Sequence, residues 1–120
     1  MQQHALVSGA SIAGLSTAWW LARTGWRVTV LERSSAFRDG GQNVDVRGVA
    51  KEVLDRMGLV EQVRACNTTE TGTVLVEEDG SVRVELPDGG GAGATAELEV
   101  LRGDLARVLL DALPSDVVVR

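Results

Sequence analysis

The sequence has one cysteine and one histidine, and each scarcity excludes a class of function. The single cysteine, Cys66, cannot form an internal disulfide, and no second histidine exists to activate it as a nucleophile. The histidine, His4, has no cysteine, histidine or carboxylate pattern around it, so no metal site is expected. No paired carboxylates stand out either. We therefore expect no catalytic side chain, and any chemistry must belong to a bound cofactor.

Basic clusters and long apolar runs are also lacking. The chain has 17 acidic and 12 basic residues and a net charge of −5, which disfavours nucleic acids and anionic membranes as partners. No apolar run approaches the ~18 residues of a membrane span. The first four residues, MQQH, lack the basic and apolar regions of a signal peptide. These features indicate a cytoplasmic protein without a membrane partner.

The most informative segment that is present is a glycine loop at residues 9–14, with the sequence GASIAG. The apolar residues 5–7 before it predict a buried strand, and apolar residues at helical spacing after it predict a helix that ends at Gly25. Residues 27–31 read as a second buried strand. This order predicts a βαβ unit whose loop presents backbone N–H groups to a pyrophosphate at a helix N-terminus.

Two side chains refine the dinucleotide prediction. Ser11 stands where the motif has its middle glycine, and its small hydroxyl could donate to a phosphate oxygen. Glu32 ends the second strand, about 20 residues after the loop, where a carboxylate can accept hydrogen bonds from ribose hydroxyls. Its charge would repel a 2′-phosphate, which leaves the ADP half of NAD or FAD. Because one ADP molecule must contact both the glycine loop and Glu32, we expect the Glu32 carboxylate within about 10 Å of the loop.

The segment after the βαβ unit predicts a loop, a short strand and two helices. Residues 34–43 read as a loop in which Gly40 and Gly41 either pass close to a flavin or only form a turn. A short strand at 44–46, a helix at 48–57 capped by Gly58 and a second helix at 59–66 follow.

Residues 73–86 alternate around Asp79-Gly80, which predicts an antiparallel hairpin. Residues 87–94 read as a flexible connection, and residues 96–100 as a strand whose wet face carries Glu97 and Glu99.

The last elements predict a return to the parallel sheet. A helix at 105–112 is stopped by Pro114, and residues 117–119 read as a parallel strand. We expect strands 5–8, 27–31 and 117–119 to be parallel neighbours, with 5–8 in the middle. The sequence thus predicts a single α/β domain over residues 1–120, with an antiparallel insertion at 73–100.

Three motifs together resemble the FAD-dependent aromatic and polyketide hydroxylases, the group A flavin monooxygenases of the p-hydroxybenzoate hydroxylase type. The glycine loop followed by Glu32-Arg33 looks like the N-terminus of that family. Residues 46–48 (VRG) with the helix after them are similar to its Arg-Gly segment, and residues 101–105 (LRGDL) to its Arg-x-x-Leu segment, whose arginine contacts the flavin nucleotide. The resemblance covers nearly the whole chain and is weakest from about residue 66 to 95.

The resemblance implies a Rossmann-like FAD-binding fold that is incomplete relative to the family, whose proteins are roughly three times longer than one ~100–150-residue domain. It implies non-covalent FAD, reduction by NADPH or NADH, and hydroxylation of an aromatic or polyketide-like small molecule. The cofactor-binding residues would be Gly9, Ser11, Gly14, Glu32, Arg33, Arg47 and Arg102. We also expect Arg47 and Arg102 to converge on one crevice at the carboxyl edge of the sheet.

Two other interpretations stay open at this point. The chain could be a non-catalytic nucleotide-binding remnant, or one half of a split flavoprotein that needs a partner chain or a carboxyl-terminal portion. It could also be an NAD-binding Rossmann domain, although the insertion at 73–100 counts against that. In isolation we expect the chain to bind FAD weakly and to show no hydroxylase activity.

Overall fold

The computed structural model describes residues 1–69, 71–87 and 98–120, and it divides into two compact units. The first unit comprises residues 1–41 and 102–120, and the second comprises residues 42–101. Residues 88–94 of the expected connection at 87–94 and residues 96–97 of the expected strand lie outside the described residues. The division of the chain into one domain with an insertion stays a prediction.

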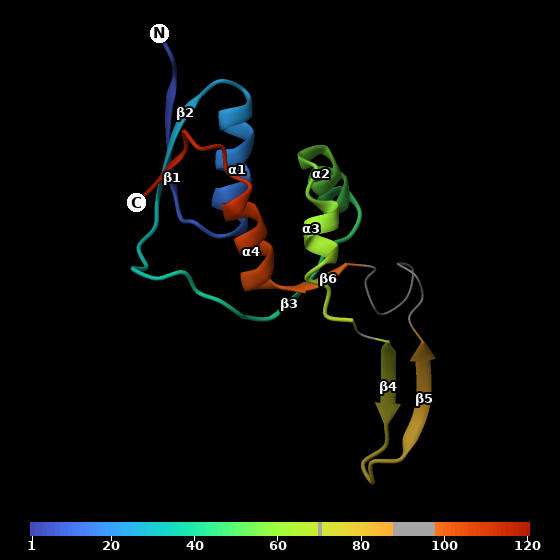
Figure 1. Cartoon of the computed structure of the whole chain (residues 1–120). Coiled ribbons are helices and arrows are strands. Elements are labelled where there is room, and N and C mark those ends of the chain that lie inside the picture. Colours follow the sequence, from blue (N-terminus) through green and yellow to red (C-terminus); the bar gives the residue numbers. More distant parts are fainter. Residues whose placement is uncertain (70, 88–97) are drawn as a thin grey trace. The chain divides into compact units, whose positions relative to one another are not determined.

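The first unit contains the parallel sheet that the sequence predicts (Figure 1). Strand β1 (His4–Ser8) pairs in parallel with β2 (Arg27–Leu31) over its whole length, and β2 pairs in parallel with β7 (Val118–Val119). The parallel arrangement is confirmed. The expected position of the first strand is wrong, because the order is β1-β2-β7 and β2 lies in the middle.

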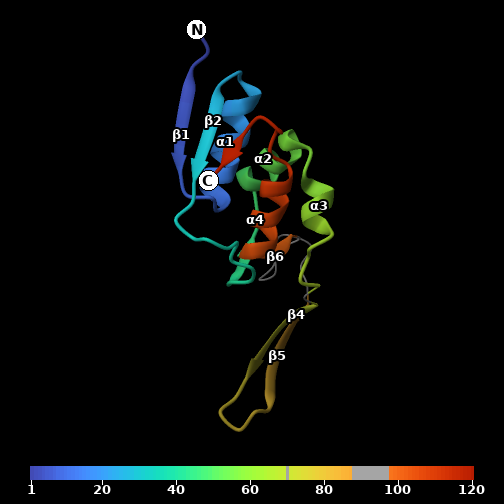
Figure 2. The ribbon, with the colours of Figure 1, turned by 60° about the vertical axis from the view of Figure 1, so that its left-hand side comes forward.

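The helices explain this strand order. Helix α1 (Ile12–Arg23) connects β1 to β2, and α4 (Arg102–Asp111) precedes β7. The two helices pack against each other on the same face of the sheet (Figures 1 and 2). Crossovers between parallel strands are right-handed, so two helices on one face move the chain across the sheet in one direction. The third strand therefore lies beyond β2 and not beside β1.

The core of the first unit lies between the sheet and these helices. Along β2, buried residues alternate with more accessible ones, and Val28 and Val30 point toward the helices. Helix α1 buries Leu15 and Ala18, which lie on one side at helical spacing. Helix α4 adds four buried residues, Gly103, Leu105, Ala106 and Leu109. The apolar periodicities in the sequence thus mark the buried side chains of β2, α1 and α4.

The second unit contains a short antiparallel pair and two helices. Strand β3 (Asn43–Asp45) pairs with β6 (Glu99–Leu101), and α2 (Val49–Met57) and α3 (Val60–Arg64) lie between them in the sequence. Gly58 caps α2 with a φ of 72°, a left-handed conformation that glycine adopts without strain, as predicted. Among the described residues of this unit, the buried ones are Val46, Leu54, Met57, Leu59, Val63, Leu98, Glu99 and Val100.

Glu99 is buried, which contradicts the expectation of a wet strand face at this position. Its carboxylate accepts a hydrogen bond from the side chain of Asn43, and its backbone N–H donates to Asn67 Oδ1 at 3.0 Å. Its carbonyl accepts from the N–H of Thr68 at 2.8 Å. Alternation predicts which face of the strand a residue occupies, but it does not show polar partners that are distant in the sequence. These hydrogen bonds offset the free-energy cost of burying the carboxylate.

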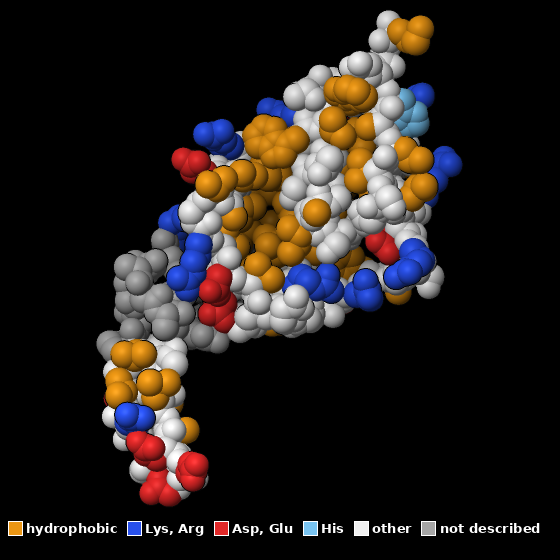
Figure 3. All heavy atoms as spheres, turned by 180° about the vertical axis from the view of Figure 1, so that it is seen from behind, with side chains coloured by type: hydrophobic (Ala, Val, Ile, Leu, Met, Phe, Trp, Pro, Cys, Tyr) orange, Lys and Arg blue, Asp and Glu red, His pale blue; other side chains and the backbone are white. Residues whose placement is uncertain are grey.

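The predicted hairpin is confirmed in β4 (Gly72–Val76) and β5 (Val82–Pro87), which pair in antiparallel fashion with an irregularity at Leu75/Val76. At its turn, Asp79 accepts hydrogen bonds from the backbone N–H and hydroxyl of Ser81, and these bonds hold the pKa of Asp79 below its ordinary value. Figure 3 shows exposed hydrophobic side chains along the hairpin and acidic ones at its tip.

Candidate functional site: a dinucleotide pocket

The glycine loop is held against the sheet and the first helix at close range. The N–H of Gly9 donates to the carbonyl of Leu31 at 2.7 Å, and Gly9 has a φ of 97° that other residues rarely adopt. A Cβ at Gly14 would lie 1.8 Å from the carbonyl oxygen of Gly9. The first glycine therefore permits the turn, and the last permits α1 to begin directly against it.

The N-terminus of α1 is open to an anion. Ser11 is the N-cap in an extended conformation and makes no side-chain capping bond, and the first turn has no acidic residue. The free backbone N–H groups and the positive end of the helix dipole are thus not satisfied by a carboxylate of the helix itself. The Ser11 hydroxyl instead accepts a hydrogen bond from Nη1 of Arg102 at 3.1 Å. This places a guanidinium beside the helix N-terminus.

Glu32 bridges the glycine loop and the chain that follows β2. Its Oε2 accepts the N–H of Ala10 and its Oε1 accepts the N–H of Ser34, both at 2.8 Å. The expected short distance from the Glu32 carboxylate to the loop is confirmed. The Ser34 and Ala10 bonds hold the pKa of Glu32 below its ordinary value, and the charge of Arg38 adds to this effect. A carboxylate has about four acceptor positions, so each oxygen can still accept a ribose hydroxyl.

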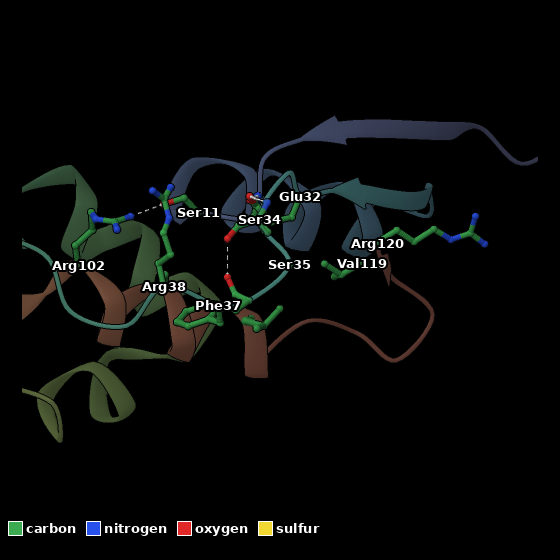
Figure 4. Close-up of a pocket in the computed structure, with 13 residues that line it drawn as sticks. Ser11, Glu32, Ser34, Ser35, Phe37, Arg38, Arg102, Val119 and Arg120 are labelled. Carbon is green, nitrogen blue, oxygen red and sulfur yellow. Dashed lines mark hydrogen bonds between the residues drawn. The ribbon is translucent and has the colours of Figure 1, made fainter.

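These groups line one pocket of about 210 Å³ in the first unit (Figure 4). Glu32, Ser11 and Arg102, all expected from the sequence, meet in its wall. Other polar groups come from the segment after β2, and apolar ones from α4 and β7. The full lining is Ala10, Ser11, Glu32, Ser34, Ser35, Ala36, Phe37, Arg38, Arg102, Ala106, Leu110, Val119 and Arg120. The pocket thus combines an anion-binding end with apolar surface.

The segment after β2, residues 34–41, forms one wall of the pocket and is fixed to α4. The guanidinium of Arg107 lies 3.8 Å from the centre of the Phe37 ring and 3.4 Å from Asp39 Oδ1. The N–H of Gly103 donates to the carbonyl of Gly40 at 2.8 Å. A Cβ at Gly103 would lie 2.4 Å from the backbone nitrogen of Gly40. Glycine at position 103 therefore lets this wall lie directly on the helix.

Gly41, which the sequence left as either a flavin approach or a turn, passes along the side chain of Arg102. A Cβ there would lie 3.1 Å from Arg102 Nε, and the φ of Gly41 is 106°. The close approach of this backbone is therefore to the arginine that reaches Ser11. Neither alternative named that contact.

Two expected residues lie elsewhere. Arg33 is exposed and does not line the pocket. Arg47 belongs to the second unit, where its Nη2 lies 3.0 Å from Asp45 Oδ2. The convergence of Arg47 with Arg102 and the roles of both Arg33 and Arg47 stay predictions.

The sequence analysis missed the pocket residues of the segment after β2, among them Ser35, Phe37 and Arg38. They lie in irregular backbone, so no periodicity marks them. The signal that could have marked them is an arginine within the loop that follows an acidic strand end.

Comparison with known proteins identifies the family of the chain. Residues 2–115 match the family described as FAD binding domain. The chain belongs to this family. FAD is therefore its cofactor, and the resemblance to flavin-dependent monooxygenases is confirmed.

The relatives of this FAD-binding chain include named monooxygenases. An uncharacterised protein of Mycobacterium tuberculosis is 41% identical over 115 residues, covering 93% of this chain and 31% of that protein. Monooxygenase CTB7 of Cercospora beticola is 40% identical over 116 residues, covering 92% and 27%. The crystal structure of tetracycline destructase Tet(55) is 32% identical with a TM-score of 0.83, covering 99% and 29%. The chain thus spans about 30% of the relatives it matches.

Membrane-spanning helices and metal-binding clusters are both absent from residues 1–69, 71–87 and 98–120. No helix in that part of the chain has the length and apolar character needed to cross a membrane. No group of three or more histidine, cysteine, aspartate or glutamate side chains there could hold a metal ion.

Proposed function

We propose that this chain binds the ADP half of FAD within a flavin-dependent monooxygenase that hydroxylates an aromatic or polyketide-like small molecule. The observation that carries the proposal is the shared pocket of Ser11, Glu32 and Arg102, which three separate segments bring together. The relatives named as monooxygenases support the reaction class.

The residues fit the two polar parts of ADP. The open N-terminus of α1 and the Arg102 guanidinium supply N–H donors and positive charge for a diphosphate. The Glu32 carboxylate, held by Ala10 and Ser34, is fixed where it can accept ribose hydroxyls. Gly9 permits the turn of the loop, and Gly14 lets the loop lie directly against the start of α1. Each group is held in place before the ligand binds, so little conformational entropy is lost on binding.

The apolar wall fits the purine. Ala106 and Leu110 of α4 and Val119 of β7 line the pocket together with Phe37. Such surfaces favour a flat heterocycle whose apolar area is removed from water.

FAD, when bound, supplies the redox chemistry, with NADPH or NADH as the reductant and oxygen as the source of the hydroxyl. This chain's residues bind and orient it, and none of them performs a bond-making step. Arg33 and Arg47 contribute further cofactor contacts in this proposal. The substrate is bound by a carboxyl-terminal portion or partner chain, and the protein acts in the cytoplasm.

Calorimetric titration of the folded chain tests the proposal. ADP and FAD should bind, and adenosine 2′,5′-bisphosphate should bind at least tenfold more weakly than AMP, which carries the same 5′-phosphate, because the 2′-phosphate meets the Glu32 carboxylate. A chain that is folded by circular dichroism but does not bind ADP would contradict the proposal. Equal affinity for AMP and the bisphosphate would contradict the assignment of Glu32 to the ribose.

A further inference from the structure

We propose that Arg38 is a diphosphate-binding residue of the pocket, and that Arg107 holds the loop that aims it. The proposal rests on the proposed dinucleotide function and adds a second guanidinium to it. Neither role was expected from the sequence.

Arg38 lies where an anion would enter. It lines the pocket from the segment after β2, and Figure 4 shows its side chain extending toward Ser11. Its charge lowers the pKa of Glu32, so it is near enough to act on this site. Among the described residues, no hydrogen bond or ion pair occupies its guanidinium, which is exposed. Its donors are therefore available to a ligand.

The other arginines of the pocket are placed differently. Arg102, on the α4 side, already donates one hydrogen bond to Ser11. Arg120 extends away from Ser11 in Figure 4. Arg38 and Arg102 thus approach the N-terminus of α1 from two different walls. A diphosphate offers oxygens in two directions, and planar guanidinium groups bind such oxygens in pairs.

A second positive charge near Glu32 favours the binding of a diphosphate in this pocket. The lowered pKa of Glu32 keeps its carboxylate ionised at neutral pH, so an entering diphosphate meets a negative charge. Arg102 alone offsets part of that repulsion. With Arg38 facing the same space, the pocket gains a further positive charge near both the carboxylate and the anion.

The neighbours of Arg38 on both sides are fixed by one residue of α4. Arg107 stacks on Phe37 at 3.8 Å and pairs with Asp39 at 3.4 Å. Both contacts restrain the backbone around position 38, since Phe37 and Asp39 flank it. Arg107 itself does not line the pocket and is a positioning residue.

The test compares ligands that differ only in phosphate. For the Arg38→Gln variant, the Kd for ADP should rise about tenfold, the scale of hydrogen bonds to a charged group, while the Kd for adenosine stays unchanged. Calorimetry serves for ADP, and NMR shift titration serves for the weaker adenosine. Arg38→Lys keeps the charge but lacks the paired N–H donors of the guanidinium, so it should recover part of the lost ADP affinity.

The matched control is Arg23→Gln. Arg23 lies at the carboxyl end of α1 against Trp19, outside the pocket lining, and the variant makes the same change in net charge. It should bind ADP as the wild type does. For Arg107→Gln, the Kd for ADP should rise about threefold, and addition of Arg38→Gln should give less than the product of the two losses.

The outcomes separate the two proposals. A folded wild-type chain that does not bind ADP would overturn the proposed function. If the wild type binds ADP but Arg38→Gln binds it equally well, only the role of Arg38 is overturned. Equal losses for ADP and adenosine would also overturn it, because they would indicate a general change in the pocket.

Discussion

Arg102 donates a hydrogen bond to the hydroxyl of Ser11 at 3.1 Å, although 91 positions separate them in the sequence. The bond joins the start of α4 to the start of α1. It also gives Ser11, which replaces the middle glycine of the nucleotide motif, a role that a glycine could not have. The serine hydroxyl holds the arginine that we propose for the diphosphate.

Ser11→Ala should therefore weaken ADP binding by about threefold, because Arg102 loses a partner that orders it. Ser11→Thr keeps a hydroxyl and should retain more of the affinity. Calorimetric titration with ADP measures both variants. Unchanged affinity of Ser11→Ala would show that Arg102 does not depend on this bond.

Glu32→Gln should lower the stability of the chain in a pH-dependent way. An amide has one oxygen, so either Ala10 or Ser34 loses its acceptor. Because the pKa of Glu32 is lowered in the fold, its stabilising contribution is present above the ordinary value of 4.5 and is lost as pH falls through the lowered one. Thermal melts should show a constant difference between pH 7 and about 5 that narrows below 4.5. A difference that grows toward acid pH would have the wrong sign.

Gly14→Ala should destabilise the first unit by about 3 kcal/mol, because the added methyl group meets the Gly9 carbonyl at 1.8 Å. Urea denaturation measures the change. Thr17→Ala, at an exposed site of the same helix, is the control and should stay within about 0.5 kcal/mol of the wild type. Equal stability of both variants would mean that the loop can move away from α1.

Leu15→Ala and Leu6→Ala make the same chemical change at opposite extremes of burial. Leu15 is fully buried and should lose about 2–5 kcal/mol of unfolding free energy. Leu6 is 66% exposed and should lose about 0.5 kcal/mol or less. Denaturant titration of both variants tests on which side of the sheet the core lies.

Arg47→Gln tests whether Arg47 contacts the flavin half of FAD and not the ADP half. Arg47 lies outside the first unit, which holds the proposed ADP site. If it contacts the flavin side, the variant should weaken FAD binding several-fold and leave ADP binding unchanged. Fluorescence titration with FAD and calorimetry with ADP make the comparison. A loss for both ligands would argue against a flavin-side role.

Local patterns predicted the elements well, because glycine loops, caps and alternation act over a few residues. The βαβ unit, the cap at Gly58 and the hairpin around Asp79 are all of this kind. The strand order was not predictable in this way, since it depends on α1 and α4 sharing one face. Burial of Glu99 likewise depends on Asn43, which is distant in sequence.

The residues of the candidate site also differ in whether local patterns predict them. Glu32 and the glycine loop are joined by short-range geometry, so the spacing rule found them. Arg38 stands in irregular backbone, and its direction depends on Phe37 and Asp39 meeting Arg107 of α4. No pattern within the loop encodes that contact.

The central position of β2 has a consequence for hydrogen exchange. Both edges of β2 are paired, with β1 on one side and β7 on the other, and the pairing with β7 continues in the bond from the Glu32 N–H to the Arg120 carbonyl. Amide protons in the middle of β2 should thus be among the slowest to exchange with deuterated solvent. On β1, amides that do not face β2 should exchange faster, so exchange rates would alternate along the first strand, whereas Thr29 and Val30 of the second strand should both exchange slowly.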